Sequence, residues 1–154
     1  MSIFVADEQS EEVDLTALHG LAELVIREEG YPETAEATLL FVNNDEMAAY
    51  NRRFLDRDGP TDVLAFPVED LMPGVVPDLD ANNPPLLLGD VIVAPAYIRD
   101  QAEEFEVTFD DEMSLMVTHG LLHLLGYDHQ TDEQAEMMEG RERTILERIG
   151  KVRR

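Results

Sequence analysis

The sequence contains no cysteine and no tryptophan, and only one of its eleven cationic side chains is a lysine. Without cysteine, disulfide bonds, Cys-ligated zinc and iron–sulfur clusters are all excluded. No apolar run approaches the roughly 18 residues that a membrane-spanning helix needs. Residues 1–8 also lack the basic start and the apolar stretch of a secretion signal. We therefore expect a cytoplasmic protein with no membrane partner.

Positive charge is scarce, whereas negative charge is abundant. The 154 residues include 34 Asp and Glu against 11 Lys and Arg, which gives a formal net charge of −23 at pH 7. Because nucleic-acid affinity depends mainly on cations placed against phosphates, this balance argues against a general polyanion binder and leaves room for a local basic groove. A hydrophobic content of 44% supports a packed core. The length predicts one domain over residues 1–154.

The hydrophobic periodicity predicts strands and helices that alternate along most of the chain. We expect strands over residues 2–6, 38–42, 62–66 and 86–93. We expect helices over residues 14–29, 44–54, 95–106, 108–125 and 131–150, with Asn44, Thr108 and Thr131 as N-caps. This order predicts a single-domain α/β (α+β) sandwich with a mixed four-stranded sheet and about five helices.

Residues 67–85 form a proline-rich segment with little periodicity. They contain five of the eight prolines of the chain. A loop of this length is unusual in a compact domain. We interpret it as either a functional flap that closes over substrate or a disordered insertion.

The segment that carries chemistry is HGLLHLLGYDH at residues 119–129. His119 and His123 are four residues apart, which places both side chains on one face of a helix. Gly126 lets the chain turn out of that helix, and the turn can bring His129 back toward the other two. Three converging imidazoles can hold a tetrahedral metal ion and leave one position open.

Two other interpretations of these histidines stay open. The three imidazoles could form a hydrogen-bonded structural cluster, although buried imidazoles on an apolar helix need a partner for each nitrogen. The fourth histidine, His19, stands alone in an amphipathic helix and is interpreted as structural. The spacing matches the zinc helix of metzincin proteases, but Gly120 stands where those enzymes have the Glu that acts as general base. Peptide hydrolysis by that route is therefore disfavoured.

Three segments of the chain together resemble the YbeY family of bacterial metal-dependent endoribonucleases. Residues 119–129 resemble the histidine motif of the family, PTDVLAFP at 60–67 is similar to its PTDVLSFP, and LGDVI at 88–92 is similar to its LGDI. The segments occur in the same order, and the resemblance covers nearly the whole chain. It implies one Zn²⁺ per chain held by His119, His123 and His129, where other divalent ions could also bind.

The resemblance also implies a substrate and partners. It implies an endoribonuclease of the single-strand type that matures the 3′ end of small-subunit ribosomal RNA and acts in ribosome quality control. The implied partners are ribosomal RNA, the small ribosomal subunit and ribosome-associated proteins.

The chain departs from the family pattern at two positions. Leu55 stands where many members have an Arg that faces RNA, and Ala65 replaces the usual Ser. Arg52, Arg53 and Arg57 are therefore candidates for RNA contact, with an ordinary surface role as the alternative.

Most of the remaining charged residues, near the histidine motif and at the end of the chain, are interpreted as structural or solvent-exposed. Asp128 is a candidate to support a metal-binding imidazole through a hydrogen bond, or else a turn residue. Lys151, Arg153 and Arg154 are interpreted as an ordinary basic tail. We expect the acidic residues of the last helix to form a solvated face: Asp132, Glu133, Glu136, Glu139, Glu142 and Glu147.

The residue pattern leaves two alternative functions open beside the endoribonuclease. One is a metallohydrolase that acts on a peptide or a small molecule. The other is a non-enzymatic ribosome-biogenesis factor whose zinc is structural. A structural zinc has four protein ligands, so a carboxylate would have to complete the three histidines.

Overall fold

Four strands and five helices make up the part of the chain that the structure, a computed structural model, describes: residues 1–78 and 84–154. In chain order these elements are β1 (Ser2–Glu8), α1 (Leu15–Glu28), β2 (Glu36–Val42), α2 (Asn44–Leu55), β3 (Val63–Pro67), β4 (Leu87–Val93), α3 (Pro95–Glu104), α4 (Phe109–Leu124) and α5 (Asp132–Arg148).

The strands form one mixed sheet in the order β1-β2-β4-β3. β1, β2 and β4 run parallel, and β3 pairs antiparallel with β4 at one edge. The two inner strands are the most buried, and Leu39, Phe41, Val91 and Val93 in them are fully buried, as expected for strands covered on both faces. The predicted α/β sandwich with a mixed four-stranded sheet is confirmed.

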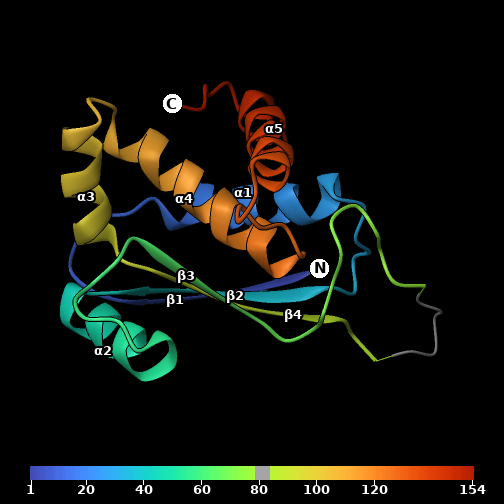
Figure 1. Ribbon diagram of the computed structural model, residues 1–154, viewed down its shortest axis with the longest axis horizontal. Coiled ribbons are helices and arrows are strands. Elements are labelled where there is room, and N and C mark those ends of the chain that lie inside the picture. The colour runs from blue at the N-terminus through green and yellow to red at the C-terminus, as the bar shows by residue number, and fades with distance from the viewer. Residues whose placement is uncertain (79–83) are drawn as a thin grey trace.

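Helices cover the two faces of the sheet unequally. Figure 1 shows α1, α3, α4 and α5 on one side of the sheet and α2 on the other. α4 lies at the centre of the larger layer, in contact with β3, β4, α1, α3 and α5. Eleven of its 16 residues are buried, because a helix that is apolar on nearly every side must be surrounded by protein. His119 and His123 therefore lie on the most enclosed of the described helices.

The beginnings of the helices follow their capping residues. Thr108 and Thr131 cap α4 and α5 as predicted, since their side chains accept hydrogen bonds from the backbone N–H groups three residues on. The expected cap of α2 is wrong by one residue. Asn43, not Asn44, accepts from the backbone N–H of Glu46 at 2.8 Å, and Asn44 is already helical.

Two helices end two residues earlier than expected. α3 ends at Glu104, because Glu106 adopts a left-handed conformation with φ of 57°. α5 ends at Arg148, and Gly150 with φ of 74° reverses the chain there. Glycine adopts this conformation without a steric penalty.

The proline-rich segment 67–85 begins within the sheet, because Pro67 is the last residue of β3. After it, Leu71 packs against the core, and Met72 and Val75 form an isolated bridge. Residues 79–83 lie outside the described residues. The two interpretations of this segment, flap or insertion, depend in part on them and stay predictions.

Candidate metal centre

His119 and His123 lie one turn apart on α4 and project from the same face. Their ring centroids are 4.6 Å apart and nearly perpendicular. This is the arrangement that a spacing of four residues produces on a helix. Because α4 is fixed between the sheet and three other helices, the two rings are held by a rigid element.

The turn after α4 brings His129 to the same point. Its ring centroid is 5.3 Å from that of His119 and 5.1 Å from that of His123. One ring nitrogen from each of the three residues lies within 4.8 Å of the others. Gly126 makes this turn with φ of 100°. A Cβ atom there would collide with the backbone carbonyl of Leu71, so this position requires glycine.

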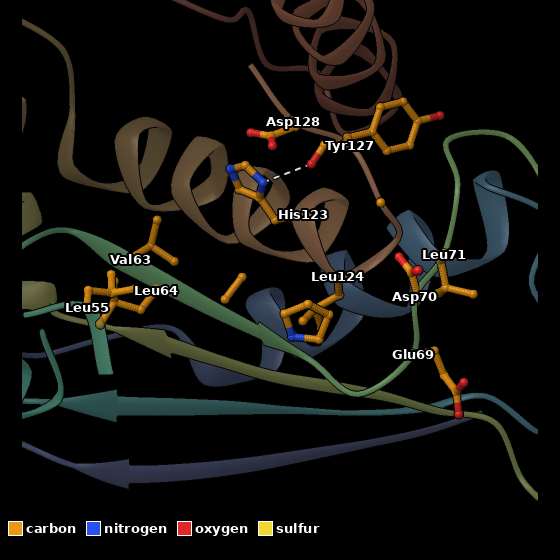
Figure 2. A pocket seen from close by; sticks show the side chains of 13 residues that line it. Leu55, Val63, Leu64, Glu69, Asp70, Leu71, His123, Leu124, Tyr127 and Asp128 are labelled. Atoms are coloured by element: carbon orange, nitrogen blue, oxygen red, sulfur yellow. Dashed lines mark hydrogen bonds between the residues drawn. The ribbon is translucent and has the colours of Figure 1, made fainter. Parts of the chain in front are cut away.

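Hydrogen bonds to protein acceptors fix the tautomers of two of the imidazoles. His119 Nδ1 lies 3.1 Å from the carboxylate of Glu142, and His123 Nδ1 lies 2.9 Å from the backbone carbonyl of Tyr127; Figure 2 shows the second of these contacts. A carboxylate and a carbonyl only accept hydrogen bonds, so each Nδ1 carries a proton. In the neutral form of both rings, which metal binding requires, the Nε2 atoms are then unprotonated, and they face each other at 3.1 Å.

This geometry fits a shared metal ion. Two unprotonated nitrogens at 3.1 Å repel each other unless a cation lies between them. Tetrahedral Zn²⁺ with Zn–N bonds of about 2.0–2.1 Å holds its ligand nitrogens about 3.3 Å apart. The carboxylate–histidine and carbonyl–histidine contacts are also those that commonly orient metal-binding imidazoles. The three predicted histidines therefore present a donor set that could hold a metal ion.

The environment favours the protonation states that metal binding requires. Burial lowers the pKa of His123, and the neighbouring His119 and His129 lower it further. A lowered pKa favours the neutral imidazole, which is the form that binds metals. Burial alone would raise the pKa of Glu142, but the hydrogen bonds and charges of His119 and Arg153 outweigh it and lower the pKa. Glu142 is therefore ionised beside His119.

The prediction that the acidic residues of the last helix all face solvent is wrong for Glu142. Its side chain is only 1% exposed and makes hydrogen bonds with both His119 and Arg153. A signal for this was present in the sequence. Glu142 lies four residues after Met138 and four before Leu146, both buried, so helical periodicity places it on the apolar stripe of α5.

Asp128 makes the contact of a turn residue. Its Oδ1 accepts a hydrogen bond from the backbone N–H of His129 at 2.8 Å. Among the described residues, Glu142 and the carbonyl of Tyr127 are the acceptors that hold ring nitrogens of the three clustered imidazoles. The geometry favours the turn interpretation, and a supporting role for Asp128 at the metal stays a prediction.

Gly120 lies where α4 packs closely against the sheet. A Cβ atom at this position would lie 2.6 Å from a methyl group of Val91 and 2.9 Å from one of Val63. A glutamate there would have to push aside the side chains of Val63 and Val91. The packing of α4 on the sheet thus disfavours, at this position, the glutamate that serves as general base in the metzincin pattern.

The predicted RNA-contact arginines lie around the end of α2. Arg52 pairs with Asp56 at 3.4 Å and with Asp58 at 3.2 Å. The guanidinium of Arg53 lies over the ring of Phe54. Among the residues that the structure describes, neither Arg52, Arg53 nor Arg57 lines a cavity that contains an imidazole. Their contact with RNA stays a prediction.

Two cavities open beside the imidazoles. One, of about 400 Å³, lies between β3, the segment after it and the end of α4, and includes Leu55 and His123. Figure 2 shows its side chains, with Glu69 and Asp70 on the side away from Val63. The other, of about 380 Å³, contains all three imidazoles and is also lined by Asp62, Arg153 and Arg154. The interpretation of Arg153 and Arg154 as an ordinary basic tail is therefore wrong.

His19 lies apart from this site. It is on α1, with its side chain 42% exposed, and its Nδ1 lies 3.0 Å from Glu23. Of the described helices, none is both long enough and apolar enough to cross a membrane.

Comparisons with known proteins give a consistent result. Residues 4–150 match the family model described as endoribonuclease YbeY. A protein named endoribonuclease YbeY from Bacillus mycoides is 39% identical over 146 residues, which are 94% of this chain and 93% of that protein. One of the same name from Acidothermus cellulolyticus is 40% identical over 139 residues, 89% of this chain and 85% of that protein.

A solved structure has a similar fold. The solution structure of a protein from Thermotoga maritima superposes with a TM-score of 0.62. The two sequences are 26% identical, and the match covers 96% of this chain and 91% of the other. The mixed sheet and its helices are therefore an arrangement that has also been observed in solution.

Proposed function

The chain belongs to the YbeY endoribonuclease family, and from this premise we propose that it is a metal-dependent endoribonuclease acting on ribosomal RNA. The proposed substrate is the 3′ end of small-subunit ribosomal RNA, in a single-stranded region. We further propose a role in ribosome quality control, in the cytoplasm, together with the small ribosomal subunit and proteins bound to it.

One observation supports the proposed metal dependence more than any other. The Nε2 atoms of His119 and His123 face each other at 3.1 Å, while each Nδ1 is held by an acceptor. When both rings are neutral, neither therefore has a proton to place between the two nitrogens. A shared divalent cation resolves the repulsion, and His129 supplies a third nitrogen.

We propose that this cation is Zn²⁺, one per chain. The donors are all imidazole nitrogens, which suit zinc, and three protein ligands leave a position open, as in catalytic rather than structural zinc sites. Such an ion supplies Lewis-acid polarisation of a phosphoryl oxygen.

The residues around the ion have separate tasks. His119, His123 and His129 hold it, Glu142 and the carbonyl of Tyr127 orient two of the rings, and the fixed position of α4 keeps the site ordered before substrate binds. Gly120 offers no side chain for the proton transfer used in metzincin peptide hydrolysis. Peptide cleavage by that route is therefore disfavoured at this site.

The test is RNA cleavage by zinc-loaded protein, compared with the variants His119→Ala and His19→Ala. The substrates are ribosomal RNA with an extended 3′ end and, separately, casein. We expect metal-dependent RNA cleavage that falls at least about 100-fold in His119→Ala, the scale of losing one preorganised stabilising group. We expect His19→Ala to match the wild type, because His19 lies on α1 away from the cluster.

Other outcomes would contradict the proposal in distinguishable ways. Equal RNA cleavage by His119→Ala would identify a contaminating ribonuclease. Cleavage of casein would favour the peptide hydrolase, and cleavage of neither substrate would favour a non-enzymatic biogenesis factor.

A further inference from the structure

The chain folds back toward the metal site after α5. Gly150 adopts φ of 74°, and the N–H of Lys151 bonds the carbonyl of Leu146 at 2.9 Å. The ammonium group of Lys151 then pairs with Asp111, in the first turn of α4, at 2.8 Å. Residues 151–154, which we call the arm, therefore lie against α4 and α5. The match to the family model ends at residue 150, just before the arm begins.

Two arginines of the arm are anchored by buried carboxylates. Arg153 Nε donates to Glu142 at 3.2 Å, and Arg154 Nε donates to Glu112 at 2.6 Å. Both glutamates are 1% exposed. The guanidinium of Arg154 also lies 3.8 Å from the ring centre of Phe105. Because the anchoring groups are buried in helices, the two guanidinium groups have defined positions.

These guanidinium groups lie in the same cavity as the three imidazoles. Among the described residues that line it, Arg153 and Arg154 are the side chains with a permanent positive charge. Their side chains are 20% and 30% exposed, so they remain partly accessible. A guanidinium has five N–H donors. Nη1 of Arg153 donates to the backbone carbonyl of Arg154 at 2.8 Å, and its Nη2 lies 3.7 Å from Glu139. Each of these nitrogens carries a second N–H that can face an anion.

The carboxylates do not simply cancel these charges. Glu142 shares its charge between Arg153 and the N–H of His119. Glu112 shares its charge between Arg154 and the amide of Gln101. Each of these two buried carboxylates therefore has another donor on its second oxygen. A third carboxylate, Glu139, lies 3.7 Å from Arg153 Nη2, but its side chain is 45% exposed, so solvent screens its charge.

We propose that Arg153 and Arg154 bind the phosphate groups of single-stranded RNA beside the scissile bond. This inference rests on the proposed function. A chain with a net charge of −23 repels a polyanion at long range, so local cations must hold the strand at the metal. Arginine suits this task, because its planar fork can donate two parallel hydrogen bonds to one phosphate.

The test measures binding without cleavage. The probe is a fluorescent single-stranded 2′-O-methyl oligoribonucleotide, which lacks the free 2′-hydroxyl, and its anisotropy is titrated with zinc-loaded protein at several salt concentrations. The test variant is Arg153→Gln with Arg154→Gln. The matched control is Arg143→Gln with Arg148→Gln, which removes the same charge from exposed positions on α5.

We expect the arm variant to bind at least about tenfold more weakly than the control at low salt, because it loses two phosphate contacts. The slope of log affinity against log salt should fall by about 0.7 for each lost contact, or about 1.4 in all. Arg154→Gln alone leaves the contact between Arg153 and Glu142 intact, so it keeps the test valid if the double variant fails to fold. It should lower the slope by about 0.7 while retaining the zinc.

An arm variant that matches the control in affinity and slope, while the wild type cleaves RNA, would overturn this inference alone. A wild type that neither binds the probe nor cleaves RNA would overturn the proposed function and this inference with it.

Discussion

Replacing His123 with alanine is expected to lower the affinity for Zn²⁺ by at least about 100-fold. Zinc-finger sites bind Zn²⁺ with a free energy of roughly 10–16 kcal/mol shared among four ligands, so the loss of one ligand removes about a quarter of that energy. His123 is the middle ligand of the cluster, and its ring lies within 5.1 Å, centroid to centroid, of both other rings. Its loss leaves two imidazoles and no enclosed site. The measurement is metal content per chain after dialysis, with a chelator competition titration for the affinity.

His19→Ala is the matched control for this substitution. His19 lies on α1 and pairs with Glu23, so its loss should leave about one zinc per chain, because all three imidazole ligands remain in place. Metal retained at full occupancy in His123→Ala would place the ion elsewhere.

Replacing Gly126 with alanine is expected to destabilise the fold by about 2–4 kcal/mol, from a positive φ combined with a steric clash. Gly126 has φ of 100°, and a Cβ atom there would collide with the carbonyl of Leu71. Since relief of this clash must move the turn that carries His129, zinc affinity should fall as well. Urea unfolding measures the loss of stability, and zinc titration of the folded variant measures the loss of zinc affinity.

Gly140→Ala is expected to change the stability of the fold in the opposite direction. Gly140 lies inside α5, and a Cβ atom there has no neighbour within 4 Å among the described residues. Alanine should therefore stabilise the helix by about 0.5–1 kcal/mol. A Gly126→Ala variant as stable as Gly140→Ala would show that the turn does not require glycine.

The parts of the fold that the sequence predicted depend on local chemistry. Thr108 and Thr131 predict where α4 and α5 begin, because an N-cap and its hydrogen-bond partner are three residues apart in the chain. The convergence of the histidines was likewise predictable. His119 and His123 share one helix face, and Gly126 sets the turn between that helix and His129.

The parts that the sequence did not predict depend on contacts between distant segments. Glu142 lies 23 residues from His119, and its helical periodicity indicates burial but not its partner. Arg154 lies 42 residues from Glu112. The sequence alone predicts a solvated tail, because the glutamates that pair with Arg153 and Arg154 come close to them only when α4 and α5 pack together. The close packing at Gly120 was also not predictable from the sequence, because its two close neighbours, Val63 and Val91, lie on β3 and β4.

Zinc K-edge X-ray absorption of the zinc-loaded protein tests most directly the claim that three imidazoles share one cation. We predict three imidazole nitrogens at about 2.0–2.1 Å and one further light-atom ligand. The outer-shell scattering of the rings distinguishes imidazole from carboxylate. A spectrum with one imidazole or none, or with a shell of six oxygens, would contradict the claim.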